Sequence, residues 1–160
     1  MKRPYEILRA DSISLAGDRE LRMQGSVDEL WNVLHPLGLS WIGFYLDTGD
    51  DQLALGPRRD KPACSPIGLH GVCGQAYRER RIVVIRDVAV LGENYVACDP
   101  RDRSEVVVPL WDGSHVWGVL DVDSFDVGAF DEHDARELAQ FVHAARLSTR
   151  SATEIPVRIG

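Results

Sequence analysis

Apolar and polar positions along the chain predict two amphipathic helices. Apolar residues recur at helical spacing over 27–34, and Ser26 and Glu29 form the pattern of a capping box at its start. Pro36 is expected to end this helix. A second helical stripe follows Asp131, which is a suitable N-cap residue. We therefore expect one helix before the central part of the chain and one after it.

Between these helices, compact apolar runs bounded by turn residues predict strands. The predicted strands are 40–46, 52–56, 82–85, 104–111 and 115–124. Short polar turns join the first two and the last two, which indicates antiparallel hairpins. A proline-containing loop is expected over 57–69 and a short helix over 71–80. This order predicts an α+β fold with a central antiparallel sheet, and the helices are expected to cover one face.

Size and charge then limit the function classes. A chain of 160 residues favours one domain, which we expect over 26–147. Residues 1–25 are expected to be a helical or irregular segment, and 148–160 a loosely held tail. The net charge of −7 argues against a nucleic-acid-binding face. No signal peptide or apolar stretch of membrane-spanning length is recognised, so a cytoplasmic location without a membrane partner is expected.

Three cysteines bring in candidate chemistry. Cys64 and Cys98 lie on predicted polar loops, whereas Cys73 lies on the predicted short helix and is expected to be core. An odd number of thiols in a cytoplasmic chain does not indicate a structural disulfide framework. Inert thiols, a metal site and redox chemistry stay open. Zinc is the weakest, because His70 and Cys73 give a spacing that fits no common zinc pattern.

Carboxylates and aromatic residues mark a second candidate site. Asp121 and Asp123 alternate along one predicted strand, so they face the same side, and Glu105 stands across the hairpin. Buried together, such carboxylates would have raised pKa values; otherwise they are a solvated strand end. Trp41 and Tyr45 also share one face of a strand. They are core residues or the wall of an apolar pocket.

Several motifs together resemble the GAF-domain free methionine-(R)-sulfoxide reductases. The matching stretches are Trp41-Ile42-Gly43-Phe44-Tyr45-Leu46, Leu55-Gly56-Pro57, Lys61-Pro62-Ala63-Cys64, Gly71-Val72-Cys73-Gly74, Ala97-Cys98-Asp99, Ser104-Glu105-Val106-Val107-Val108-Pro109-Leu110 and Gly118-Val119-Leu120-Asp121-Val122-Asp123-Ser124. The resemblance covers residues 26–146, and the ordered set of three cysteine motifs makes it specific.

The resemblance implies a single GAF domain that reduces free methionine (R)-sulfoxide. It implies that Cys98 attacks the sulfoxide sulfur, that Cys64 resolves the product to a disulfide, and that Cys73 is an accessory thiol. Thioredoxin, reduced by NADPH through thioredoxin reductase, would then reopen the disulfide, and no bound cofactor or metal is expected. The interval from Cys64 to Cys73 is slightly shorter than the family leads us to expect. Cys64 must nevertheless come within about 7 Å of Cys98, Cα to Cα.

The resemblance also implies roles for the other candidates. Glu105, Asp121 and Asp123 match the carboxylate cluster in the family's pocket, and Trp41 and Tyr45 match its aromatic residues. One carboxylate, by hypothesis Glu105, would protonate the sulfoxide oxygen, and the others, Asp121 and Asp123, would bind the substrate ammonium. A homodimer is expected, with the N-terminal segment as its contact. The alternative is a GAF sensor that binds a small ligand without chemistry, which leaves the three cysteine motifs unexplained.

Overall fold

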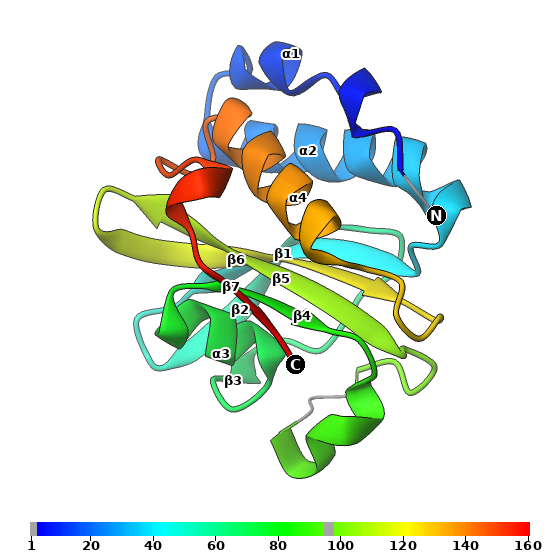
Figure 1. The fold of residues 1–160 in the computed structure, drawn as a ribbon. Coiled ribbons are helices and arrows are strands. Elements are labelled where there is room, and N and C mark those ends of the chain that lie inside the picture. The colour runs from blue at the N-terminus through cyan, green and yellow to red at the C-terminus, as the bar shows by residue number, and fades with distance from the viewer. Residues whose placement is uncertain (1–2, 95–97) are drawn as a thin grey trace.

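The computed structural model describes residues 3–94 and 98–160. These residues form a seven-stranded sheet in the order β3-β2-β1-β6-β5-β4-β7. Figure 1 shows helices on both faces of this sheet, α2 and α4 on one side and α3 on the other. The predicted α+β class, a central sheet flanked by helices, is confirmed.

The elements have well-defined bounds. The strands are β1 (Trp41–Asp47), β2 (Gln52–Arg59), β3 (Ile67–Gly68), β4 (Ile82–Ile85), β5 (Ser104–Asp112), β6 (His115–Ser124) and β7 (Val157–Ile159). The α-helices are α1 (Ala10–Ser14), α2 (Arg19–Leu34), α3 (Val72–Glu79) and α4 (Glu132–Ala144). Short 3-10 turns are η1 (Tyr5–Ile7), η2 (His35–Leu37), η3 (Val88–Asn94) and η4 (Ala152–Glu154).

The sheet separates two apolar cores. On one face, α2 and α4 pack over side chains such as Phe44 and Val108, and on the other α3 packs over Val83 and Val107. The expectation that helices cover a single face is therefore wrong. Its physical reason is visible in the central strands, whose continuous apolar runs are buried on both sides.

Helix α2 begins earlier than the capping-box pattern predicts. The Asp18 side chain accepts a hydrogen bond from the Leu21 N–H at 2.9 Å, so Asp18 is the N-cap. Ser26 lies buried in the middle of the helix. The predicted end is confirmed, because α2 stops at Leu34 and Gly38 adopts a φ of +110° that favours glycine.

Strand β2 is longer than predicted and replaces the first part of the expected loop over 57–69. It runs to Arg59, and its register with β1 shifts at Gly56 and Pro57. Such a β-bulge accommodates a proline, which cannot donate a ladder hydrogen bond. The segment that carries Cys64 follows directly after this bulged end of β2.

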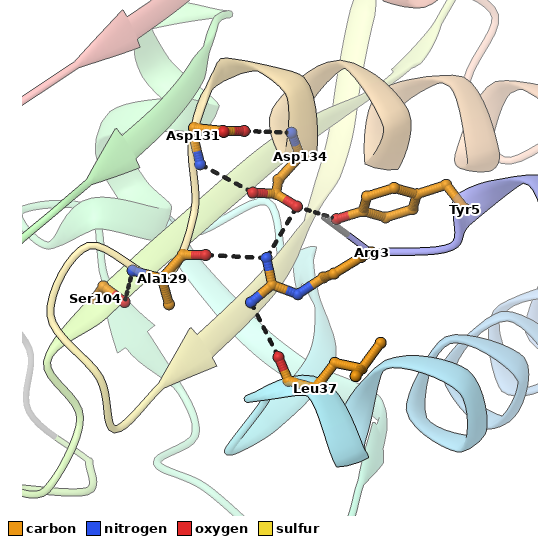
Figure 2. Close-up of polar contacts among 7 residues, drawn as sticks. All are labelled: Arg3, Tyr5, Leu37, Ser104, Ala129, Asp131 and Asp134. Atoms are coloured by element: carbon orange, nitrogen blue, oxygen red, sulfur yellow. Dashed lines mark hydrogen bonds and ion pairs between the residues drawn. The ribbon is translucent and has the colours of Figure 1, made fainter. Parts of the chain in front are cut away.

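Both ends of the chain are tied to the fold. β7 pairs in parallel with β4, so the expectation of a loosely held tail over 148–160 is wrong, although the proposed domain limits stay a prediction. Figure 2 shows the buried Arg3 guanidinium donating to Asp134 at 3.0 Å and to the Ala129 and Leu37 carbonyls at 2.9 and 3.3 Å. Among the described helices, none is long and apolar enough to cross a membrane.

Candidate active site

Strand register brings the three predicted carboxylates together. Asp123 on β6 pairs with Glu105 on β5 and with Trp41 on β1, and Asp121 follows two positions earlier on β6. Because side chains two apart share one face of a strand, all of them point toward α3. They line a cavity of about 440 Å³ together with Tyr45, Ala63 and Cys98.

The carboxylates sit in an environment that retains protons. Glu105, Asp121 and Asp123 are 7%, 6% and 9% exposed. Burial raises the pKa of all three, most strongly for the two aspartates, where the neighbouring negative charges add to it. Hydrogen bonds from the aspartates work in the opposite direction on the Glu105 pKa. The three carboxyl groups therefore titrate as one cluster, and burial favours its protonated forms.

Cys73 lies against this cluster as a buried free thiol. Burial, followed by the charge of Asp121, raises the pKa of the Cys73 thiol. The Sγ of Cys73 and carboxylate oxygens of Glu105 and Asp121 lie within 4.8 Å of one another, a spacing that could hold a cation. The exposed His70 belongs to no such group in the described chain, so the spacing of His70 and Cys73 does not build a zinc site.

Trp41 and Tyr45 form the wall of the cavity, with ring centroids 6.0 Å apart. Gly43 lies between them, and a Cβ there would overlap the Trp41 ring. The Trp41 indole N–H donates to the Lys61 carbonyl and the Tyr45 hydroxyl to the Cys64 carbonyl, both at 2.8 Å. The aromatic pair therefore also holds the loop that carries Cys64, a role that the strand pattern did not indicate.

Cys64 and Cys98 are joined as a disulfide beside this wall. Their Cα atoms are 5.6 Å apart, which satisfies the distance expected from the sequence. Both residues are exposed, and Cys98 lines the cavity. The slightly short interval between Cys64 and Cys73 does not prevent this pairing. Ala97, part of the motif around Cys98, lies outside the described residues.

The charge of Asp99, next to Cys98, is balanced by cations. Arg101 donates to both carboxylate oxygens of Asp99, at 3.0 and 2.9 Å, and Lys61 stands 3.5 Å away. The hydrogen bonds from Arg101 hold the pKa of Asp99 well below its usual range. Because these cations offset its charge, Asp99 opposes thiolate formation at Cys98 less than an unpaired carboxylate would.

Sequence reasoning missed a fourth acid, Asp102. It is 7% exposed, lines the cavity and accepts a hydrogen bond from the Ser40 hydroxyl at 2.9 Å. Its only sequence signal is its place four residues after Cys98. A loop aspartate is ordinarily solvated, so contact with Ser40, far away in the chain, could not be anticipated.

The chain is similar in sequence to several known proteins. The family model described as "GAF domain" matches residues 22–147. The chain is 42% identical over 106 residues to the Escherichia coli free methionine-R-sulfoxide reductase, covering 65% of this chain and 62% of the relative. The chain spans a little under two thirds of this relative and of two others, 65% of GAF domain-containing protein A of Dictyostelium discoideum and 64% of protein YtsP of Bacillus subtilis.

Solved structures align over more of the chain. The reduced fRMsr of Staphylococcus aureus superposes with a TM-score of 0.82 at 33% identity, covering 90% of this chain and 94% of that one. The free methionine-R-sulfoxide reductase of Neisseria meningitidis, solved in complex with its substrate, gives 0.79 at 33% identity, with 91% and 87% covered. The chain therefore belongs to the GAF-domain family, in the group that contains the free methionine-R-sulfoxide reductases.

Proposed function

We propose that this protein reduces free methionine (R)-sulfoxide to methionine. The observation that carries the proposal is the Cys64–Cys98 pair at the cavity whose floor is the buried carboxylate cluster. A sulfoxide needs a nucleophilic thiolate at sulfur and a proton at oxygen. The cavity offers a thiol on one side and retained protons on the other. Family membership supports the same substrate.

In the proposed first step, the Cys98 thiolate attacks the sulfoxide sulfur. The carboxylate cluster donates a proton to the sulfoxide oxygen, because burial and the neighbouring negative charges raise the pKa values of Asp121 and Asp123 and so favour their protonated forms. The oxygen then moves from the substrate sulfur to the Cys98 sulfur: a new S–O bond forms on Cys98, while the original S–O bond and the bond between the two sulfurs break. Methionine leaves, and Cys98 becomes a sulfenic acid. Trp41 and Tyr45 would cover the apolar part of the substrate.

In the second step, the Cys64 thiolate attacks the Cys98 sulfur, and hydroxide leaves and takes up a proton to form water. The two thiols thus supply the two electrons that reduce the sulfoxide. A dithiol protein of the thioredoxin type, maintained by NADPH through thioredoxin reductase, would reopen the disulfide by exchange. The exposure of Cys64 and Cys98 supports access by such a partner.

Coupled NADPH oxidation with thioredoxin and thioredoxin reductase tests the proposal. The (R) and (S) isomers of free methionine sulfoxide are compared, with Cys98→Ser as the inactive control. Turnover of the (R) isomer alone, lost in Cys98→Ser, is expected. No turnover of either isomer, with reduced cysteines and an active reductant, would instead favour a ligand-binding GAF sensor.

The proton donor within the cluster has its own test. Glu105 is the donor in our hypothesis, whereas the larger pKa increases lie on Asp121 and Asp123. If Glu105 donates the proton, Glu105→Gln loses activity at every pH and Asp123→Asn keeps it. The reverse result would assign the proton to the aspartate.

We further propose a homodimer that forms through the N-terminal layer. Ile7, Leu15 and Leu21 are 57%, 85% and 58% exposed there, which leaves apolar surface for a second copy. Sedimentation analysis should show a dimer for the full chain and a larger fraction of monomer for Leu15→Glu. A monomeric parent protein would contradict this assignment.

A further inference from the structure

Asp102 occupies a different position from the inner carboxylates. Its backbone N–H donates to the Asp99 carbonyl at 3.1 Å, so it belongs to the loop that follows Cys98. The Ser40 hydroxyl holds its Oδ1 at 2.9 Å, and the Ser40 N–H donates to the Asp123 carbonyl at 2.8 Å. Ser40 therefore fixes Asp102 beside the inner cluster at the edge of β1.

Only one oxygen of Asp102 is engaged in this way. Within the described chain, Oδ2 makes no hydrogen bond, and the residue lines the cavity. A carboxylate with one anchored and one available oxygen is oriented before a ligand arrives. Such an arrangement suits a cationic hydrogen-bond donor, which gains from both charge and direction.

The charges around Asp102 distinguish it from its neighbours. Burial and the nearby Asp99 raise its pKa, whereas the Ser40 hydrogen bond, Lys61 and Arg101 act in the opposite direction. Glu105 and Asp123 also face Asp102, and burial and neighbouring negative charges raise the pKa values of both. Asp99 also lines the cavity, but Arg101 already donates to both of its carboxylate oxygens. Among the described residues near these cations, Asp102 is the acid that keeps one carboxylate oxygen without a hydrogen bond.

We propose that Asp102 binds the α-ammonium of the substrate and so selects the free amino acid over an N-acylated or peptide-bound one. The proposal rests on the proposed function. It leaves the inner cluster to the sulfoxide oxygen and places the ammonium beside Asp102, where Lys61, which also lines the cavity and stands 3.5 Å from Asp99, would supply a cation for the α-carboxylate. A substrate whose nitrogen is acylated has no positive charge there, so it gains nothing from Asp102.

Binding to the unreactive Cys98→Ser protein tests this assignment without turnover. Calorimetry would compare free L-methionine (R)-sulfoxide with its N-acetyl derivative, in the parent and in Asp102→Asn. The asparagine keeps an oxygen for Ser40 and removes the charge. We expect Asp102→Asn to weaken binding of the free amino acid about tenfold to a hundredfold and to leave the acetyl derivative unchanged.

Controls separate charge at this site from folding and from net charge. Asp126→Asn removes one charge from an exposed residue and should bind both compounds like the parent. Asp102→Glu should restore part of the preference for the free amino acid. Equal weakening for both compounds, or none for the free one, would overturn the proposal, as would a parent that binds neither.

The two proposals fail in different ways. If the wild-type protein turns over the (R) sulfoxide while Asp102→Asn keeps its preference for the free amino acid, only the role of Asp102 is wrong. If binding depends on the ammonium and on Asp102 but wild type shows no turnover, the reductase assignment is wrong and the ammonium site stands.

Discussion

At the scale of single residues, the surroundings of a side chain decide its chemistry more than its type does. Asp99 and Asp121 are both aspartates near the same cavity. Arg101 holds the pKa of Asp99 low, whereas burial and two neighbouring acids raise that of Asp121. The surroundings therefore favour the charged form of Asp99 and the protonated form of Asp121.

Asp121→Asn should stabilise the protein at alkaline pH. Because the Asp121 pKa is raised in the folded state, its stabilising protonated form is present below its ordinary pKa and is lost as pH rises through the folded value. The amide avoids that loss, so we expect about 1–3 kcal/mol more stability at about pH 8 and little change near pH 4. Thermal unfolding at both pH values measures it, with Asp126→Asn as control. An equal effect at both would contradict the prediction.

Tyr45→Phe should make the Cys64–Cys98 disulfide easier to reduce. The change removes the hydroxyl that donates to the Cys64 carbonyl at 2.8 Å and leaves the ring in place. A lost hydrogen bond of about 1 kcal/mol corresponds to roughly a fivefold shift toward the dithiol. Titration with glutathione buffers and alkylation measures this ratio. Tyr77→Phe, a tyrosine that does not hold this loop, should leave it unchanged.

At the scale of elements, the start of α4 is the point to which the N-terminus is attached. Asp134 accepts hydrogen bonds from Arg3 at 3.0 Å, Tyr5 at 2.5 Å and the Asp131 N–H at 3.0 Å (Figure 2). Its reciprocal bond with Asp131 completes a capping box. One carboxylate thus caps the helix and neutralises a buried guanidinium, with Arg3 only 4% exposed.

Asp134→Ala should be more damaging than Arg3→Met. Asp134→Ala leaves the Arg3 charge buried without its partner, which costs about 3–5 kcal/mol. Arg3→Met removes the buried guanidinium itself, and Asp134 keeps its hydrogen bonds from Tyr5 and from the Asp131 N–H. Asp131→Ala, which loses only the cap, should cost about 1 kcal/mol. Urea unfolding gives the three free energies. A loss for Arg3→Met as large as that for Asp134→Ala would contradict this order.

In the molecule as a whole, the two faces of the sheet have different surroundings. The α2 and α4 face is apolar core, and the α3 face combines a smaller core with the acidic cavity. β7 closes the edge of β4, through hydrogen bonds that include Gly160 N–H to the Val84 carbonyl at 2.8 Å. The last residues therefore protect an edge that would otherwise be open to other strands.

Truncation after Ile155 should destabilise the protein and promote association. It removes β7 but keeps the buried Ala152 and Ile155. The loss of several ladder hydrogen bonds should cost about 1–3 kcal/mol, or roughly 2–10 °C in Tm. Thermal unfolding and light scattering measure both effects. The control is Arg158→Ala, which removes partly exposed contacts with Glu79 and Gln75 and should change the Tm little. If truncation left the Tm unchanged, the prediction would be wrong.

Features that arise from local periodicity and from short turns could be predicted from the amino-acid sequence alone. Strands 82–85 and 115–124 and the helix after Asp131 were predicted with their observed bounds or nearly so. The common face of Asp121 and Asp123 follows from the period of a strand alone. The family motifs carried the pairing of Cys64 with Cys98, which spacing could not predict.

Contacts between distant segments could not be predicted in this way, because they depend on how the whole chain packs. The start of α2 at Asp18, the pairing of β7 with β4 and the burial of Asp102 against Ser40 all depend on partners far away in the chain or on a choice between two local caps. The same holds for the raised pKa values of the acid cluster. Burial comes from strands β1, β5 and β6 meeting under α3, and a residue's solvation is a property of the packed chain rather than of its neighbours in sequence.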